Sequence, residues 1–176
     1  MAKVSFTKLG LSKDKLNEIK TIDFNGQVIE IRQYLPINEK LEMVSRIINK
    51  SADENNFANP VKLNVFTILE IVYAYTNINF TEKQKEDEIK LYDLFISSGL
   101  WYKVLDAIPG MEYGQVYGAV QDCAEAIYTY RNSILGILET ISADYSNLNL
   151  DAEAIREKIG NPETLGLVKD ILTKLG

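Results

Sequence analysis

Residues 113–145, YGQVYGAVQDCAEAIYTYRNSILGILETISADY, carry the longest amphipathic helix pattern in the chain. At 100° per residue, apolar side chains gather on one face and polar side chains on the other. The apolar face covers nearly half of the circumference, which is wider than the roughly 100° stripe of an ordinary surface helix. It contains Val116, Val120, Cys123, Ala124, Ile127, Tyr130, Ile134, Leu138, Ile141 and Tyr145. The pattern predicts one long central helix, with Ile134 and Leu138 in the core and other elements packed over it.

The clearest local signal before this helix is TIDFNGQVIEIR at residues 21–32. The Asn-Gly pair at 25–26 is the preferred loop of a type I′ hairpin, because both of its central residues need positive φ. This loop places Phe24 opposite Gln27. The apolar face of the hairpin is then Ile22, Phe24, Ile29 and Ile31. A lone hairpin is marginally stable, so this one must lie against the helices or gain a strand from residues 3–9 or from a partner.

The rest of the chain predicts about seven helices, counting the long one. Apolar residues recur at helical spacing in residues 37–50, 61–76, 82–98, 100–108, 113–145, 151–159 and 162–175. In residues 61–76 they cover most of the circumference and leave only Lys62, Thr67 and Glu70 as a polar strip, which predicts the most buried helix. The predicted fold class is mainly α, an α+β fold in which an N-terminal β-hairpin precedes a bundle of about seven helices around one long amphipathic helix.

The 176 residues show no internal repeat and no linker that would divide them. They are therefore predicted to form a single domain over residues 1–176, with a hairpin region at 1–35 and a helical bundle at 36–176. Cys123, the only cysteine, lies on the apolar face of the long helix and is expected to be a small buried side chain. Apolar runs stay well short of about 20 residues and no leader pattern opens the chain, so we expect a cytoplasmic protein with no membrane partner.

Several kinds of chemistry are excluded by composition. The chain has no histidine, so it cannot hold a Ser-His-Asp or Cys-His arrangement. No Gly-rich turn follows a strand to hold phosphate, and the acidic loop at residues 51–59 lacks the ligand spacing of a calcium loop. With 19 basic and 25 acidic residues and no clustered Lys or Arg, nucleic acid is not an expected partner. The prediction is a protein that is not an enzyme, with no catalytic residues, cofactor or metal.

Ten tyrosines are many for a chain of this length, and they point to other proteins as partners. Tyr113, Tyr117, Tyr128 and Tyr130 cluster on the long helix, where an exposed phenol at the rim of the core suits a protein interface. Arg131, at the edge of the apolar face, fits an ion pair or a snorkelling side chain better than a ligand contact. The candidate partner-binding residues are Trp101, Tyr113, Tyr117, Tyr128, Tyr130 and Arg131.

The hairpin stretch TIDFNGQVIEIRQYLP leads directly into helices, and a helical remainder without histidine follows, such as SADENNFANPVKLNVFTILEIVYAYTNINF. This layout resembles small proteins of tailed-phage morphogenesis modules, and among them the phage tail assembly chaperones. The resemblance implies a protein of the host-cell cytoplasm that coats the tape-measure protein and helps to recruit tail-tube subunits. It covers general layout and no motif, so no functional residue is carried over from the family.

Two other functions remain open. One is a virion component such as a head-tail connector, which would form a closed ring as a homo-oligomer. The other is an inhibitor of a host defence or nucleic-acid enzyme, for which the net charge of −6 is suggestive. That inhibitor would be favoured if one exposed face gathered Asp23, Glu30, Glu82, Glu86, Asp87 and Glu88.

Overall fold

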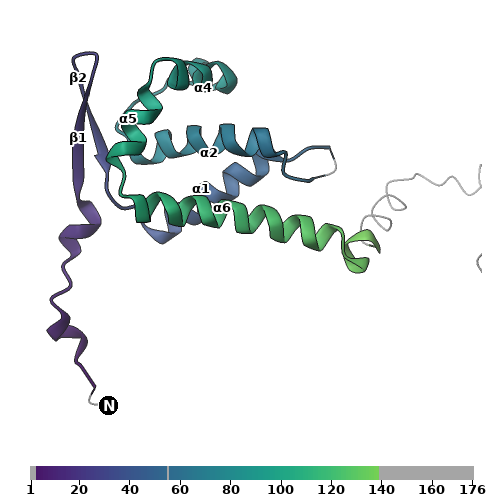
Figure 1. Cartoon of the computed structure of the whole chain (residues 1–176), viewed down its shortest axis with the longest axis horizontal. Helices are drawn as coiled ribbons and strands as arrows, with labels where there is room; N and C mark the ends of the chain where they lie inside the picture. Colours follow the sequence, from purple (N-terminus) through teal and green to yellow (C-terminus); the bar gives the residue numbers. More distant parts are fainter. Residues whose placement is uncertain (1–2, 55, 139–176) are drawn as a thin grey trace, which may run out of the picture. The chain divides into compact units, whose positions relative to one another are not determined.

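The computed structural model describes residues 3–54 and 56–138 (Figure 1). Two 3-10 helices precede the hairpin, and α-helices follow it. In chain order the elements are η1 Phe6–Leu9, η2 Lys13–Asn17, β1 Ile19–Phe24, β2 Gln27–Arg32, α1 Ile37–Ser51, α2 Pro60–Tyr75, α3 Glu82–Lys85, α4 Glu88–Ser97, α5 Leu100–Ala107 and α6 Gly110–Arg131. The predicted class is confirmed: the protein is mostly helical, with an N-terminal two-stranded antiparallel hairpin.

The chain divides into two compact units, Met1–Thr129 and Tyr130–Gly176. The second unit is described only as far as residue 138. The predicted helices at 151–159 and 162–175 therefore lie outside the described residues, and the single domain over residues 1–176 stays a prediction.

The hairpin has the predicted register, with Ile22 opposite Ile29 and Phe24 opposite Gln27. Asn25 and Gly26 have φ angles of 54° and 76°, as the type I′ loop requires. The buried face is the predicted one, because Ile29 and Ile31 are buried while Ile22 and Phe24 are half-buried. A local pattern was enough here, since the turn alone sets which residues face each other.

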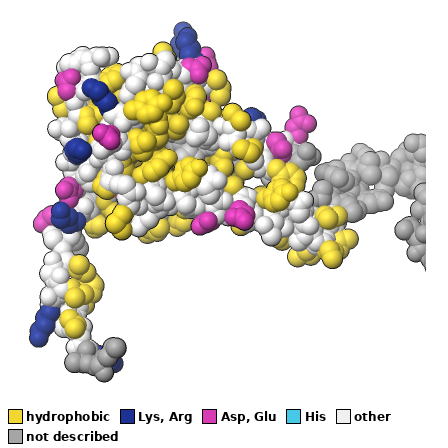
Figure 2. All heavy atoms as spheres, viewed as in Figure 1, with side chains coloured by type: hydrophobic (Ala, Val, Ile, Leu, Met, Phe, Trp, Pro, Cys, Tyr) yellow, Lys and Arg dark blue, Asp and Glu magenta, His cyan; other side chains and the backbone are white. Residues whose placement is uncertain are grey.

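The segment before β1 does not supply the strand that the hairpin was expected to be able to gain from residues 3–9. It forms η1 and η2 instead, joined by Gly10 in the left-handed region at φ 61°. Figure 2 shows hydrophobic side chains along this segment, exposed to solvent. A strand needs a neighbour to satisfy its backbone groups, and the segment has none among the described residues.

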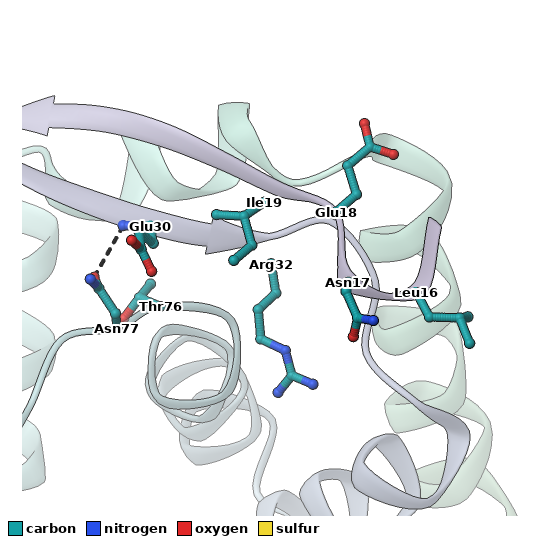
Figure 3. A pocket seen from close by; sticks show the side chains of 8 residues that line it. All are labelled: Leu16, Asn17, Glu18, Ile19, Glu30, Arg32, Thr76 and Asn77. Atoms are coloured by element: carbon teal, nitrogen blue, oxygen red, sulfur yellow. Dashed lines mark hydrogen bonds between the residues drawn. The ribbon is translucent and has the colours of Figure 1, made fainter. Parts of the chain in front are cut away.

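The outer edge of β2 is covered by the residues that follow α2. Ile31 forms a bridge with Thr76, and the Asn77 amide donates to the Glu30 carbonyl at 3.3 Å. The Glu30 amide in turn donates to Asn77 Oδ1 at 3.0 Å, as drawn in Figure 3. β1 packs against α5. The hairpin is thus held against the helices on one side, as its marginal stability demanded.

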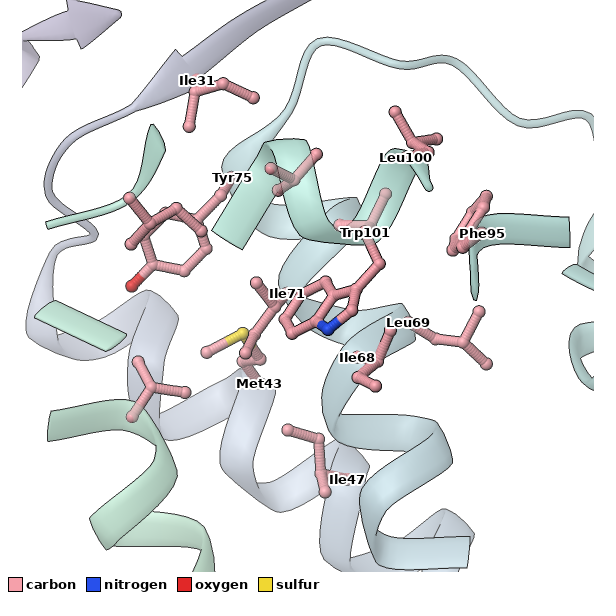
Figure 4. Close-up of a cluster of buried hydrophobic side chains, with 14 of the residues drawn as sticks. Ile31, Met43, Ile47, Ile68, Leu69, Ile71, Tyr75, Phe95, Leu100 and Trp101 are labelled. Atoms are coloured by element: carbon pink, nitrogen blue, oxygen red, sulfur yellow. The ribbon is translucent and has the colours of Figure 1, made fainter. Parts of the chain in front are cut away.

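Helix α2 lies at the centre of the core. Asn59 caps it by accepting from the amides of Val61 and Lys62 at 3.0 and 3.1 Å. It contributes nine buried residues, more than any other described helix, so the prediction that it is the most buried is confirmed. Around it Figure 4 shows Ile31 of β2, Met43 and Ile47 of α1, Phe95 of α4, and Leu100 and Trp101 of α5. The predicted polar strip of this helix does not face solvent throughout, because Thr67 and Glu70 are buried as well.

Helix α6 is shorter than the helix predicted over residues 113–145. It ends at Arg131, and Ser133 starts a new turn by accepting from the Gly136 amide at 3.2 Å. Short hydroxyl side chains compete with the helical backbone in this way. A side chain at Gly136 would collide with the carbonyl of Tyr130, so this turn requires glycine.

The buried residues of α6 lie in its first half, at Glu112, Val116 and Val120, and Ala124 packs half-buried against the core. Cys123 is exposed, and Ile134 and Leu138 are 81% and 56% exposed. The prediction that these three side chains lie in the core is therefore wrong. The apolar residues do recur at helical spacing, but the described elements pack only against the beginning of the helix.

Candidate protein-interaction surface

Three of the predicted aromatic residues, Trp101, Tyr113 and Tyr117, form a row of contacting rings that runs from the core to the surface. The rings of Trp101 on α5 and Tyr113 on α6 lie 6.4 Å apart between centroids. Tyr113 stacks on Tyr117, with centroids 5.9 Å apart and an interplanar angle of 25°. Trp101 is buried, Tyr113 is half-buried and Tyr117 is 43% exposed. Burial and the neighbouring Tyr117 raise the pKa of Tyr113, so it stays neutral at ordinary pH.

Tyr128 lies on the same side of α6, further along the helix. At 100° per residue Tyr113, Tyr117 and Tyr128 fall within an arc of about 60°. Tyr128 is 62% exposed, and its ring lies 5.8 Å from that of Phe57 in the loop between α1 and α2. We call these three residues the tyrosine stripe. Tyr117 and Tyr128 are separated along the helix by about 16 Å, or three turns.

Two glycines border the stripe on the side away from the buried face of α6. A Cβ atom added at Gly114 or Gly118 would meet no atom within 4 Å. Glycine in the middle of a helix costs about 1 kcal/mol relative to alanine, and no packing within the described residues explains that cost. The backbone of α6 is therefore accessible beside the stripe, where another helix can approach closely.

The remaining sequence candidates have other roles. Trp101 is buried in the core, so its ring packs against Tyr113 and is not accessible to a partner. Tyr130, which is exposed, and Arg131, which is half-buried, end α6 and belong to the second unit. Phe57 was missed, because the loop at 51–59 reads as polar and its one aromatic residue has no periodic neighbours to mark it.

A buried carboxylate joins the base of the stripe to the core, and sequence reasoning missed it too. Glu112 accepts from the Leu35 amide, the Lys40 ammonium and the Tyr75 hydroxyl, each at 2.8 Å. Burial and the hydrogen bond to Glu112 raise the pKa of Tyr75. Lys40 also donates to Gln115 at 3.1 Å. With every donor matched, this cluster holds α6 against α1 and α2, and it has the character of a structural network.

A second buried carboxylate, Glu70, accepts from Arg46 Nε at 2.8 Å and from Lys50 Nζ at 3.0 Å. Lys50 also bonds Glu88 at 2.6 Å. Burial opposes the charge on Lys50, but its bonds to Glu88 and Glu70 prevail and raise its pKa. A pocket of about 540 Å³ opens beside these groups, where the buried Tyr73 hydroxyl has no hydrogen-bond partner within the described part of the chain. Each carboxylate is neutralised by a cation, so this is an ion-pair network.

A smaller pocket of about 300 Å³ lies at the base of the hairpin (Figure 3). It is lined by Leu16, Asn17, Glu18, Ile19, Glu30, Arg32, Thr76 and Asn77. The Arg32 guanidinium is engaged by both oxygens of Glu39, at 2.7 and 3.1 Å. This pairing raises the pKa of Arg32 and lowers that of Glu39. The Thr76 hydroxyl in this lining donates to the Val72 carbonyl at 2.7 Å.

Other features of the described residues bear on function. Over 3–54 and 56–138, no group of three or more His, Cys, Asp or Glu side chains is placed to hold a metal ion. In the same residues, no helix is both long and apolar enough to cross a bilayer. Comparison of the chain with protein-family models, with curated proteins and with solved structures gives no match.

Proposed function

We propose that this chain is a non-enzymatic assembly protein of the host-cell cytoplasm, and that it binds an amphipathic helix of a partner protein along the tyrosine stripe. The observation that carries the proposal is the line of Tyr113, Tyr117 and Tyr128 on one side of α6. Exposed tyrosines supply large contact area at small entropic cost, and an open glycine-lined backbone lets a second helix come close.

The spacing of the stripe suits such a client. Tyr117 and Tyr128 lie 11 residues apart on α6, and apolar residues on a client helix recur at three, four, seven and eleven residues. One client helix could thus contact both tyrosines. The resemblance to tail assembly chaperones suggests that the client is the tape-measure protein, a long helical molecule whose apolar stripe needs cover before the tail tube forms around it.

The test is co-expression with a phage tape-measure protein. The wild-type chain should keep the tape-measure protein soluble and be purified with it. Tyr117→Ala and Tyr128→Ala should each weaken the complex about tenfold or more, as expected for interface tyrosines. Tyr102→Ala is the matched control, because Tyr102 is an exposed tyrosine on α5 outside the stripe. Failure of the wild-type chain to solubilise the client, or equal loss in the control, would refute the proposal.

Both alternatives keep distinct signatures. A head-tail connector would sediment as a closed ring of many copies. An inhibitor of a host defence enzyme would need an uncompensated acidic face, but Glu82 pairs with Lys85 and Glu88 with Lys50. On the face shown in Figure 2, acidic side chains are scattered among basic and apolar ones. The helix-binding function therefore has the better support.

A further inference from the structure

Strand β1 has a free edge. Because Glu30 bonds Asn77 outside the hairpin, its opposite residue Thr21 also directs its amide and carbonyl away from the ladder, as do Ile19 and Asp23. Lys103 Nζ donates to the Asp23 carbonyl at 2.9 Å. Within residues 3–54 and 56–138, nothing bonds the backbone groups of Ile19 and Thr21 that face outward. In the two-stranded sheet no described strand lies on the other side of β1, so a further strand can add there.

The side chains of the N-terminal arm, residues 3–18, are exposed wherever the structure describes them. Its apolar side chains are all at least 46% exposed: Val4, Phe6, Leu9, Leu11 and Leu16. Val4 and Phe6 alternate with polar residues, as in a strand with one apolar face. The arm has four lysines against Asp14 and Glu18, so its charge is +2. The whole chain has a net charge of −6, so the rest of the chain has a charge of −8.

We propose that the free edge of β1 binds the N-terminal arm of a second copy of this chain as an added β-strand. Reciprocal exchange of arms then gives a two-fold dimer in which each copy covers the other's edge. The arm does not reach its own edge directly. It joins β1 at the end away from the turn, where the Gln33 amide donates to the Glu18 carbonyl at 2.9 Å and η2 directs the preceding residues onward. The positive arm and the negative remainder attract one another between copies.

The decisive variant is Thr21→Pro, measured by sedimentation of the full chain over a range of concentrations. The Thr21 amide faces outward, so proline removes no hydrogen bond within the hairpin but blocks the edge. Thr21→Val is the matched control, because it keeps the amide. Wild type and Thr21→Val should dimerise, and Thr21→Pro should have a dissociation constant at least tenfold higher. In the wild-type dimer, hydrogen exchange at the Thr21 amide should be slowed.

A second variant tests the arm and protects the experiment against misfolding of the hairpin. The double change Val4→Asp and Phe6→Asp alters only exposed side chains, so its thermal unfolding should match wild type while its dimer dissociates. The proposal fails if wild type stays monomeric at several hundred micromolar, or if it forms a ring of more than two copies. It fails equally if neither the edge variant nor the arm variant changes the dissociation constant.

Discussion

Glu112 holds three donors that come from three separate parts of the chain. Removing it leaves the Lys40 charge, which is itself buried, without its carboxylate. Glu112→Ala should therefore lower the free energy of unfolding by about 3–5 kcal/mol in urea denaturation. Glu125→Ala, an exposed carboxylate on the same helix, should change it by about 0.5 kcal/mol or less. Equal effects of the two changes would mean that the network does not hold α6.

Tyr73 and Tyr75 make a matched pair, since both hydroxyls are buried but only one is bonded. Tyr75→Phe removes the hydrogen bond to Glu112 and should cost about 1.5–3 kcal/mol. Tyr73→Phe removes a hydroxyl that has no partner in the described residues, and it should stabilise the protein by about 1 kcal/mol. Chemical denaturation of both variants checks the order. A large loss on Tyr73→Phe would show that its hydroxyl is bonded in solution.

The titration of Tyr73 predicts a loss of stability in alkali. Burial, with the carboxylates of Glu88 and Glu70, raises the pKa of Tyr73 from 10.0 to about 12. The unfolded chain therefore releases this proton first, and the free energy of unfolding should fall as pH rises from 10 to 12. In Tyr73→Phe the fall over that interval should be smaller. Urea denaturation at a series of pH values measures the difference, and identical slopes would contradict the assignment.

Neither buried carboxylate could be predicted from the sequence. Glu112 meets Lys40 across 72 positions and Tyr75 across 37. A helical periodicity places Glu70 on a polar strip, and a polar strip usually faces water. Glu70 is buried instead because Arg46 and Lys50 of α1 pair with its carboxylate. Burial of a charge is decided by such partners, which no local pattern contains.

At the scale of elements, α6 offers a test that separates stability from binding. Gly114→Ala and Gly118→Ala add a methyl group into open space, so each should stabilise the protein by about 0.5–1 kcal/mol through helix propensity. The same methyl groups should weaken binding of the client helix, because they keep its backbone away. Thermal unfolding and the co-purification assay measure the two effects. Stabilisation with unchanged binding would place the client elsewhere.

The elements that sequence predicts well are those determined by neighbours in the chain. The hairpin follows from Asn25-Gly26, and α2 follows from the cap at Asn59. Those predicted poorly depend on contacts made at a distance. Residues 3–11 form no strand, because a strand needs an edge to pair with. The apolar pattern continues past Ala124, the last residue of α6 that packs against the core in the described part of the chain, and Ile134 and Leu138 are exposed.

For the whole molecule, the proposed contact with a client rests on aromatic anchors rather than on charge. Such a complex should survive a rise in NaCl from about 0.1 to about 1 M, because screening acts on exposed charges and hardly on buried aromatic contact. An acidic mimic that binds through ion pairs would lose affinity steeply over the same range. The pull-down repeated at both salt concentrations distinguishes them. Release of the client at high salt would favour the inhibitor.

The composition of the tyrosine stripe could be predicted only in part from the sequence. The sequence predicts several tyrosines on one helix, and the structure stacks Tyr113 on Tyr117 and places Trp101 beside Tyr113. The sequence could not distinguish the half-buried Tyr113 from the exposed Tyr117 and Tyr128, because their exposure depends on how α5 and α6 pack. Exposure, which decides whether an aromatic residue can meet a partner, is a property of the packed molecule.

The cover that Asn77 provides over β2 has a consequence for polymerisation. A hairpin with two bare edges would add strands on both sides, and such growth has no natural end, which is the geometry of amyloid. Here Thr76 and Asn77 occupy one edge, so only the β1 side accepts a strand. A strand that joins there extends the sheet on one side only. The backbone and side chain of Asn77, with Thr76, thus remove one of the two edges through which such hairpins could stack into fibrils.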